Sequence, residues 1–262
     1  MSQPDSRTIY NTQSLQLIAG QRVLLDELNI NIYPGETWCV LGKNGSGKTT
    51  LLTTMAGLQP PASGQLFLGN RNLVHLHRKN IAQKMGMLFQ EYPDSFPVTV
   101  FESVMAGRYP HMKSWQLESA VDREKTLSAL AFVQMTSFTH RMVNTLSGGE
   151  KRRVALATLL AQDPAIYLLD EPANHLDLHF QASLLPDLCS ALKQKNKTVF
   201  MSLHDINLAT HLTDKCLLLM GNGEHLLGET REIMTRENLE TLYNQPFEKI
   251  ETETGTKWLP RF

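Results

Sequence analysis

A glycine-rich loop between an apolar run and a helical segment constrains the fold of this chain more than any other feature. Residues 42–49 read Gly-Lys-Asn-Gly-Ser-Gly-Lys-Thr and fit the spacing G-x-x-x-x-G-K-[ST]. The apolar run 37–41 before the loop predicts a buried strand, and residues 50–56 after it predict a helix that stops at Gly57. A strand, a glycine loop and a helix in this order are typical of α/β folds built on a parallel sheet.

The same loop predicts a site for phosphate groups. Glycines let backbone N–H groups turn inward around an anion, and the helix N-terminus adds the positive end of its dipole. Lys48 can then reach the β- and γ-phosphates, and the Thr49 hydroxyl can bind Mg²⁺. The residues predicted to bind a nucleoside triphosphate are Gly42, Lys43, Asn44, Gly45, Ser46, Gly47, Lys48, Thr49 and Thr50.

Length, charge and cysteine content set broad limits. The 262 residues suffice for one large domain, or for one domain with an insertion. A net charge of −1 and a pI near 6.8 argue against nucleic-acid binding, which normally requires a basic excess. Three widely spaced cysteines among apolar neighbours predict buried thiols in a reducing compartment. Without a secretory signal or a run of about 18 apolar residues, we expect a cytosolic protein that reaches a membrane through a partner.

Strand-like and helical patterns alternate along most of the chain, which predicts a parallel sheet covered by helices. Continuous apolar runs predict buried strands at 85–89, 165–169 and 198–202. Helices are predicted at 150–162 and 180–193, and strand pairs within 14–41 and 216–227. Residues 91–146 differ, because prolines are followed by a helical pattern through Val121, Leu127, Leu130 and Val133. This segment predicts a helical insertion.

Two carboxylates follow the predicted strand at 165–169. Asp170 stands at the carboxyl end of the strand, where ligands of parallel sheets collect, and can hold Mg²⁺ directly or through water. Glu171 can orient and deprotonate an attacking water molecule. Gln90, at the end of another strand, can bind Mg²⁺ or water through its amide oxygen. Together with the phosphate loop, these groups supply the positioning and charge neutralisation that phosphoryl transfer needs.

A second helix start also carries an anion-binding pattern. Ser147 is a good N-cap, and Gly148 and Gly149 leave the first N–H groups of the helix open. One triphosphate needs only one such loop. The second loop therefore implies either a second nucleotide or a second copy of the chain.

The order of these motifs resembles that of the ATP-binding cassette (ABC) ATPases. Leu146–Glu150 is similar to the family's signature motif, Leu168–Pro172 to its acidic strand, and Asn174–Asp177 to its D-loop. Gln90 and His204 stand where the family has its Q-loop and its switch histidine. The resemblance implies a P-loop NTPase fold with an ABC-type core, an N-terminal antiparallel β subdomain and an inserted α-helical subdomain.

The resemblance also implies domain limits and the place of ATP. It places a single ABC transporter domain at 8–244, with its core at 8–90 and 147–230, the insertion at 91–146 and a C-terminal tail at 245–262. Two copies would pack head to tail. Ser147 and Gly149 of each copy would close on ATP held by the phosphate loop of the other, and Asp177 would lie between the copies.

The resemblance further implies roles for the polar residues around the triphosphate. His204 would contact the γ-phosphate and steady the transition state with Glu171. Gln90 would join the core to the insertion and report the nucleotide state to a partner. With Lys48, these residues form the predicted catalytic set, and Thr49, Gln90 and Asp170 form the predicted Mg²⁺ set.

A few positions depart from the family pattern or have ordinary explanations. The family's adenine-stacking aromatic residue falls at Ala19, so base recognition is either loose or supplied by Ile18 and Val23, and we expect weak discrimination of ATP from GTP. Lys151–Arg153 is interpreted as a solvated helix face. His175 and His179 have a metal-like spacing, but they lie in and after the D-loop and lack further ligands.

Three classes of ABC protein compete. They are the energising subunit of a membrane transporter, a soluble protein that works on ribosomes or DNA, and a non-hydrolytic binding module. A ribosome-acting protein would carry two cassettes, a DNA-repair protein would carry a long coiled coil, and a non-hydrolytic module would not need Glu171 and His204. The hypothesis is therefore the ATPase subunit of a transporter, peripheral on the cytoplasmic side of the cell membrane. Its partners would be a second copy, integral membrane permease subunits and a substrate-binding protein, with no nucleic acid.

The segment Ala106–His111 resembles a stretch in importers of metal chelates. It favours iron-siderophore, haem or cobalamin as the cargo, whereas a generic turn between helices is the ordinary explanation. Another substrate, or an exporter, remains the alternative, and a non-transport ABC protein is the least favoured.

Overall fold

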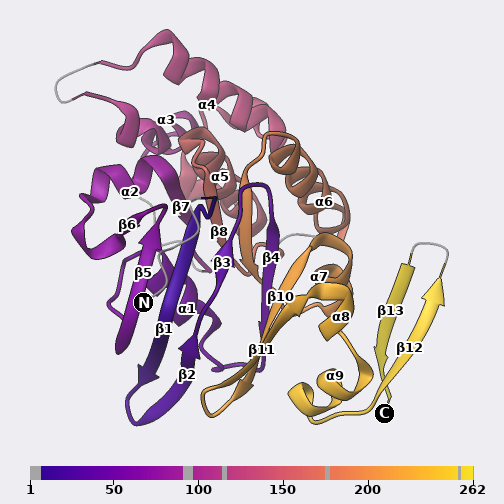
Figure 1. The fold of residues 1–262 in the computed structure, drawn as a ribbon. Helices are drawn as coiled ribbons and strands as arrows, with labels where there is room; N and C mark the ends of the chain where they lie inside the picture. Colours follow the sequence, from indigo (N-terminus) through magenta and orange to yellow (C-terminus); the bar gives the residue numbers. More distant parts are fainter. Residues whose placement is uncertain (1–6, 91–96, 114–116, 175–177, 253–254, 262) are drawn as a thin grey trace.

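The fold is described from a computed structural model that covers residues 7–90, 97–113, 117–174, 178–252 and 255–261, without the side chains of Leu178, His179 and Gln181. A six-stranded sheet in the order β11-β10-β4-β9-β8-β7 runs through its centre (Figure 1). Neighbouring strands are parallel except β10 and β11. The strands are β4 (Thr37–Gly42), β7 (Met85–Leu88), β8 (Ile166–Asp170), β9 (Thr198–Ser202), β10 (Lys215–Gly221) and β11 (Glu224–Glu229). The predicted parallel sheet and its closing hairpin are confirmed.

Alternate residues of the central strands enter two different hydrophobic cores. On β4, Cys39 and Leu41 pack into one core, and Trp38 and Val40 pack into the other. Successive side chains of a strand point to opposite faces, so a sheet covered on both sides needs apolar residues at every position. This explains why the strand runs read as continuously apolar.

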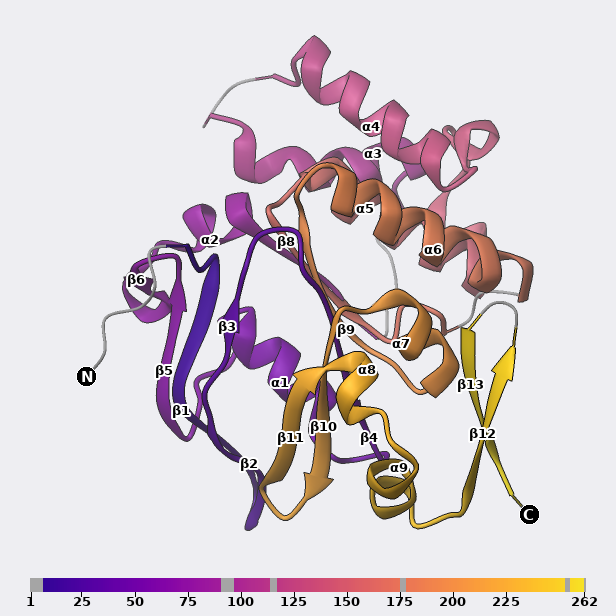
Figure 2. The same cartoon turned by 45° about the vertical axis from the view of Figure 1, so that its right-hand side comes forward.

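Helices cover both faces of the central sheet. One face carries α5 (Gly148–Gln162), α6 (Leu178–Gln194), α7 (Ile206–Leu212), α8 (Thr230–Ile233) and α9 (Arg236–Tyr243). The other face carries α1 (Lys48–Met55), which Figure 2 shows between the central sheet and the N-terminal strands. The loop 43–47 joins the carboxyl end of β4 to the start of α1.

A second, antiparallel sheet forms the N-terminal subdomain that the resemblance implied. Its order is β2-β1-β5-β6, with β3 paired to β1. The strands are β1 (Tyr10–Ala19), β2 (Arg22–Leu28), β3 (Asn31–Ile32), β5 (Ser63–Leu68) and β6 (Arg71–Asn72), followed by a 3₁₀ turn η1 (Leu73–His75) and helix α2 (Arg78–Lys84). The buried Tyr10 hydroxyl donates to the Met55 carbonyl at 2.9 Å, which ties this sheet to the end of α1.

The described part of 91–146 is helical, as predicted. It comprises α3 (Val100–Met105), the 3₁₀ segment η2 (Ala106–His111), α4 (Ala120–Phe132) and the turns η3 (Thr136–Phe138) and η4 (Val143–Thr145). Of the apolar residues in that helical pattern, Leu130 and Val133 are buried, whereas Val121 and Leu127 are 56% and 39% exposed. The buried face instead follows the helical spacing from Thr126 through Ala129 to Val133.

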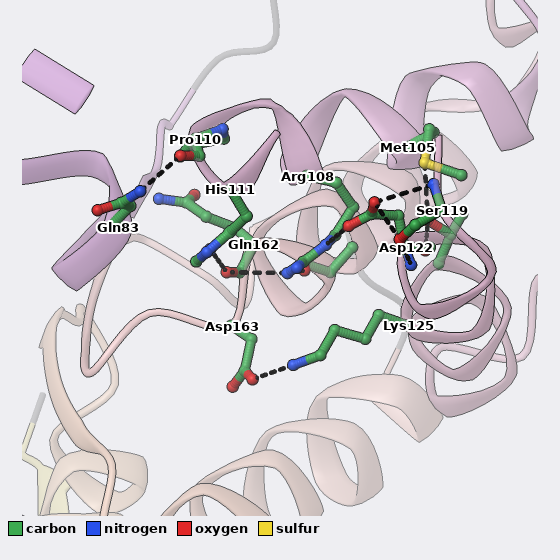
Figure 3. A network of polar contacts seen from close by, with 12 residues as sticks. Gln83, Met105, Arg108, Pro110, His111, Ser119, Asp122, Lys125, Gln162 and Asp163 are labelled. Atoms are coloured by element: carbon green, nitrogen blue, oxygen red, sulfur yellow. Dashed lines mark hydrogen bonds and ion pairs between the residues drawn. The ribbon is translucent and has the colours of Figure 1, made fainter. Parts of the chain in front are cut away.

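Figure 3 shows how polar side chains attach this insertion to the core. Arg108 is buried, pairs with Asp122 at 2.9 Å, and donates to the Ala161 carbonyl of α5 at 2.7 Å. The His111 ring nitrogen lies 2.8 Å from the Gln162 carbonyl, at the same end of α5. The segment Ala106–His111, for which a generic turn was the ordinary explanation, therefore makes specific polar contacts between the insertion and α5.

Removing the carboxylate of Asp122 should destabilise this attachment. The Ser119 hydroxyl, followed by Arg108, lowers the pKa of Asp122 to about 2. A depressed native pKa stabilises the fold above the ordinary carboxyl pKa, and that contribution is lost as pH falls through the native value. Asp122→Asn should therefore lower the free energy of unfolding by about 3 kcal/mol near pH 7, because Arg108 loses its partner while buried. Urea unfolding of both proteins should show a smaller difference at pH 3, and a difference that does not depend on pH would contradict the ion pair.

The expected tail at 245–262 carries a third, two-stranded sheet. Strands β12 (Phe247–Thr252) and β13 (Gly255–Pro260) pair antiparallel, with Phe247 and Trp258 buried. The backbone N–H of Trp258 donates to the Asn207 side-chain oxygen at 2.7 Å, and the side-chain amide of Asn207 donates back to the Trp258 carbonyl at 3.1 Å. This hairpin is thus fastened to α7. The domain limits remain a prediction.

Candidate functional site: a phosphate loop and an acidic strand end

The phosphate loop needs glycine at positions where the chain turns tightly. A Cβ atom on Gly42 would lie 2.5 Å from the Ser46 Oγ, and Gly47 caps α1 with a φ of 102°. The Ser46 hydroxyl is buried and has no hydrogen-bond partner in the described part of the chain. Buried polar groups are normally paired, so this hydroxyl is oriented for a ligand that accepts or donates a hydrogen bond in the loop.

Lys48 lies inside the same loop. Its side chain is buried, and Nζ donates to the carbonyl of Gly42 at 2.9 Å and to that of Lys43 at 3.3 Å. Burial lowers the pKa of Lys48, and the carboxylates of Glu171 and Asp170 act in the opposite direction. The loop lysine and the two acids therefore share one electrostatic environment at the carboxyl ends of β4 and β8.

Asp170 is the last residue of β8 and is fully buried. The Ser202 hydroxyl, at the end of neighbouring β9, donates to Asp170 Oδ1 at 2.5 Å. Asp170 Oδ2 has no hydrogen-bond partner among the described residues. A buried carboxylate oxygen without a donor fits a hard cation such as Mg²⁺, which prefers oxygen ligands and phosphate. Thr49, next to Lys48 at the start of α1, can add its hydroxyl.

Glu171 is surrounded by side-chain donors. Its Oε1 lies 2.5 Å from His204 Nε2, and its Oε2 accepts from Gln90 Nε2 at 3.0 Å and also from Asn174 Nδ2. The side chain is only 8% exposed. The structure thus brings together Gln90, Glu171 and His204, which are far apart in sequence. It places the Glu171 carboxylate where it can accept a proton.

The second anion-binding pattern, at Ser147, lies at the exposed start of α5. Ser147 caps α5 through a reciprocal pair with Glu150, in which its N–H donates at 2.7 Å and its Oγ accepts at 3.3 Å. Ser147 and Gly148 are exposed, and Gly148 has open space around it. This helix start is therefore available to another molecule. Asp177, which was predicted to lie between two copies, falls outside the described residues, as does His175.

Arg152 was missed by sequence reasoning. Lys151–Arg153 was interpreted as a solvated face, but Arg152 is 5% exposed and donates to backbone carbonyls at the ends of β7 and β8, so that interpretation is wrong for it. Burial lowers the pKa of Arg152 to about 10, and Asp170 and Glu171 oppose the shift, so the side chain is charged at neutral pH.

Asn174 and Ser202 were also left out of the predicted site, although both bind its acids. The polar end of the otherwise apolar run at 198–202 was a usable signal for Ser202. For Arg152, nothing in the local pattern distinguishes it from its charged neighbours.

Two of the three residues predicted to lie at the adenine end are exposed. Ala19 is exposed at the end of β1, and the preceding Ile18, which pairs with Val23, is 43% exposed. Weak discrimination between ATP and GTP therefore stays a prediction. Within the described ranges, no group of three or more acidic, histidine or cysteine side chains could hold a metal ion by itself.

Comparison with known proteins relates this chain to ATP-binding proteins of transport systems. The family model described as ABC transporter matches residues 25–174. The petrobactin import ATP-binding protein FpuD of Bacillus anthracis is 37% identical over 85% of this chain and 82% of its own length. The ferric enterobactin transport ATP-binding protein FepC of Escherichia coli is 34% identical over 88% of this chain and 85% of its own length.

Two solved structures share the fold over nearly their whole length. An ABC transporter assigned to the metal-chelate type, in an inward-facing conformation, has a TM-score of 0.84 at 28% identity and covers 97% of this chain and 98% of its own. A dimeric ATP-binding cassette, MJ0796, in a post-hydrolysis state with ADP and phosphate, has a TM-score of 0.74 at 27% identity and covers 85% and 99%.

Proposed function

The chain belongs to the ABC transporter family, and on that premise we propose that it is the ATP-hydrolysing subunit of an importer for a metal chelate. The cargo class is an iron-siderophore, haem or cobalamin. The relatives' names and the metal-chelate type transporter support this class, and so does the packed Arg108–His111 segment that resembled such importers.

The observation that carries the hydrolytic part is the placement of Glu171. Glu171 directly follows a buried parallel strand, its charge acts on Lys48 of the phosphate loop, and its carboxylate is held by Gln90, His204 and Asn174. A base held by several donors is oriented before substrate arrives, which lowers the cost of positioning the attacking water. Glu171 would take the proton of that water, and His204 would stabilise the charge that develops beside it.

ATP would bind through the backbone of the loop 42–47, with Lys48 neutralising the β- and γ-phosphates. To reach them, the Lys48 ammonium group leaves the carbonyl oxygens of Gly42 and Lys43 that it now contacts. Asp170, Thr49 and Gln90 would hold Mg²⁺, which supplies positive charge to the phosphate oxygens. The unpaired Asp170 Oδ2 supports this assignment.

A second copy of the chain would complete the site. At the exposed start of α5, the Ser147 N–H donates to the Glu150 carboxylate, and the N–H groups of Gly148 and Gly149 would bind a further anion. A related cassette is dimeric with ADP and phosphate bound. Binding of two ATP molecules would favour the closed pair, and hydrolysis would reopen it. Closure and reopening would drive separate membrane permease subunits.

The chain would act at the cytoplasmic face of the membrane, held there by the permease. Across the described residues, no helix is both long and apolar enough to cross a bilayer. A substrate-binding protein would complete the importer. The cargo would be chosen by those partners, since the cassette itself would not touch it.

Uptake measurements in the source organism test this function. Deletion of the gene should abolish the uptake of one radiolabelled metal chelate among ferric siderophores, haem and cobalamin, while amino-acid uptake stays normal. The wild-type gene should restore that uptake, and a Glu171→Gln gene should not. Normal uptake of all the chelates in the deletion strain would overturn the metal-chelate assignment.

A further inference from the structure

The buried side chain of Arg152 joins the ends of two central strands. Its Nη2 donates to the carbonyl oxygens of Asp170 at 2.6 Å and Glu171 at 2.7 Å, just past β8. Its Nη1 donates to the carbonyls of Phe89 and Gln90, just past β7. One guanidinium group therefore fixes the two chain segments that carry the Gln90 and Glu171 side chains.

The backbone of Glu171 needs this support. Its φ is 47°, a left-handed conformation that is unfavourable for a residue with a side chain and more so before a proline, here Pro172. The Glu171 N–H donates to the Ser202 hydroxyl at 2.8 Å, and its carbonyl accepts from Arg152. Strained residues persist at functional sites when their surroundings hold them from several sides.

The two strand ends meet in the side chains as well. Gln90 Nε2 donates to Glu171 Oε2 at 3.0 Å, so the position of one side chain depends on that of the other. The planar fork of an arginine can hold several carbonyls at fixed relative positions, whereas a lysine ammonium group on a flexible stem cannot. We infer that Arg152 is a positioning residue that sets the geometry of Glu171 and Gln90 for ATP hydrolysis. This inference rests on the proposed ATPase function.

Arg108 provides a matched comparison. It is also 5% exposed and also donates to backbone carbonyls, but its contacts join the insertion to the far end of α5, the helix that carries Arg152. Loss of either arginine removes a buried charged group and its hydrogen bonds. If Arg152 only stabilised the fold, the two losses would have similar consequences for catalysis.

The experiment compares Arg152→Lys and Arg152→Gln with Arg108→Lys in the full chain. We expect both Arg152 variants to lower kcat on the order of tenfold to a hundredfold, because a small misplacement of a catalytic group has that effect. The Kd for ATP should stay within about twofold, since Lys48 and the phosphate loop are unchanged. Arg108→Lys, measured as folded protein below its melting temperature, should keep the wild-type kcat.

A second measurement separates positioning from general stability. In a Glu171→Gln background, Arg152→Lys should cause a smaller loss of activity than in the wild type, because the part of its effect that acts through the Glu171 carboxylate is already gone. A loss of the same factor in both backgrounds, or a wild-type kcat in Arg152→Lys, would overturn the inference and leave the ATPase function standing. Absence of ATP hydrolysis by the wild-type chain would instead overturn the proposed function, and the inference with it. Arg152→Lys keeps the charge, so the test does not depend on the folding of Arg152→Gln.

Discussion

Glu171→Gln is expected to lower kcat for ATP hydrolysis by roughly 10³-fold, because general bases contribute about 10² to 10⁴ in rate. Glutamine has nearly the same shape, and its amide oxygen can still accept from Gln90 or Asn174. It cannot accept the proton of water at neutral pH. The phosphate loop is untouched, so the Kd for ATP should change by less than about twofold.

The same variant should accumulate as a closed dimer when Mg-ATP is added. Size-exclusion chromatography of wild type and variant, each with and without Mg-ATP, measures this directly. Glu240→Gln is a suitable control, because this half-buried carboxylate pairs with Arg236 far from the loop in sequence. Undiminished turnover by the Glu171 variant would remove Glu171 from the role of base, and loss of ATP binding would show that the change had disturbed the loop itself.

Local spacing was enough to predict the phosphate loop, the acidic strand end and the parallel sheet. In each case the signal lies within a few residues, because glycine torsions, strand alternation and helix starts are short-range properties. The motif order added the insertion and the antiparallel subdomain through family resemblance. The fold class could therefore be predicted from the sequence.

What could not be predicted depends on contacts between distant segments. Arg152 sits between two other charged residues on α5, and only the approach of β7 and β8 makes its side chain buried. The side of α4 that is buried could not be predicted for a related reason: Val121 is exposed. The register of α4 against its neighbours, which sequence alone does not define, turned Thr126 and Ala129 inward in its place. The hydrogen bond from Gln90 to Glu171 spans 81 positions along the chain, so no local pattern could reveal it.

Two inactive variants should restore activity to each other when they are mixed. Lys48→Ala removes the charge that the triphosphate needs, and Ser147→Arg blocks the exposed start of α5 with a long side chain. Each variant alone should form dimers in which both sites are damaged. In a mixed dimer, one site combines both changes, and the other has an intact loop from one chain and an intact Ser147 from its partner.

An equal mixture of the two nucleotide-free variants should regain up to about a quarter of the wild-type rate, since half of the dimers are mixed and each contains one intact site of two. Steady-state ATP hydrolysis before and after mixing measures the gain. A chain that carries both substitutions, mixed with wild type, provides the opposite arm, because every mixed dimer then has two damaged sites. If mixing Lys48→Ala with Ser147→Arg restores nothing, both halves of the site belong to one chain, and the exposed signature helix start has some other use.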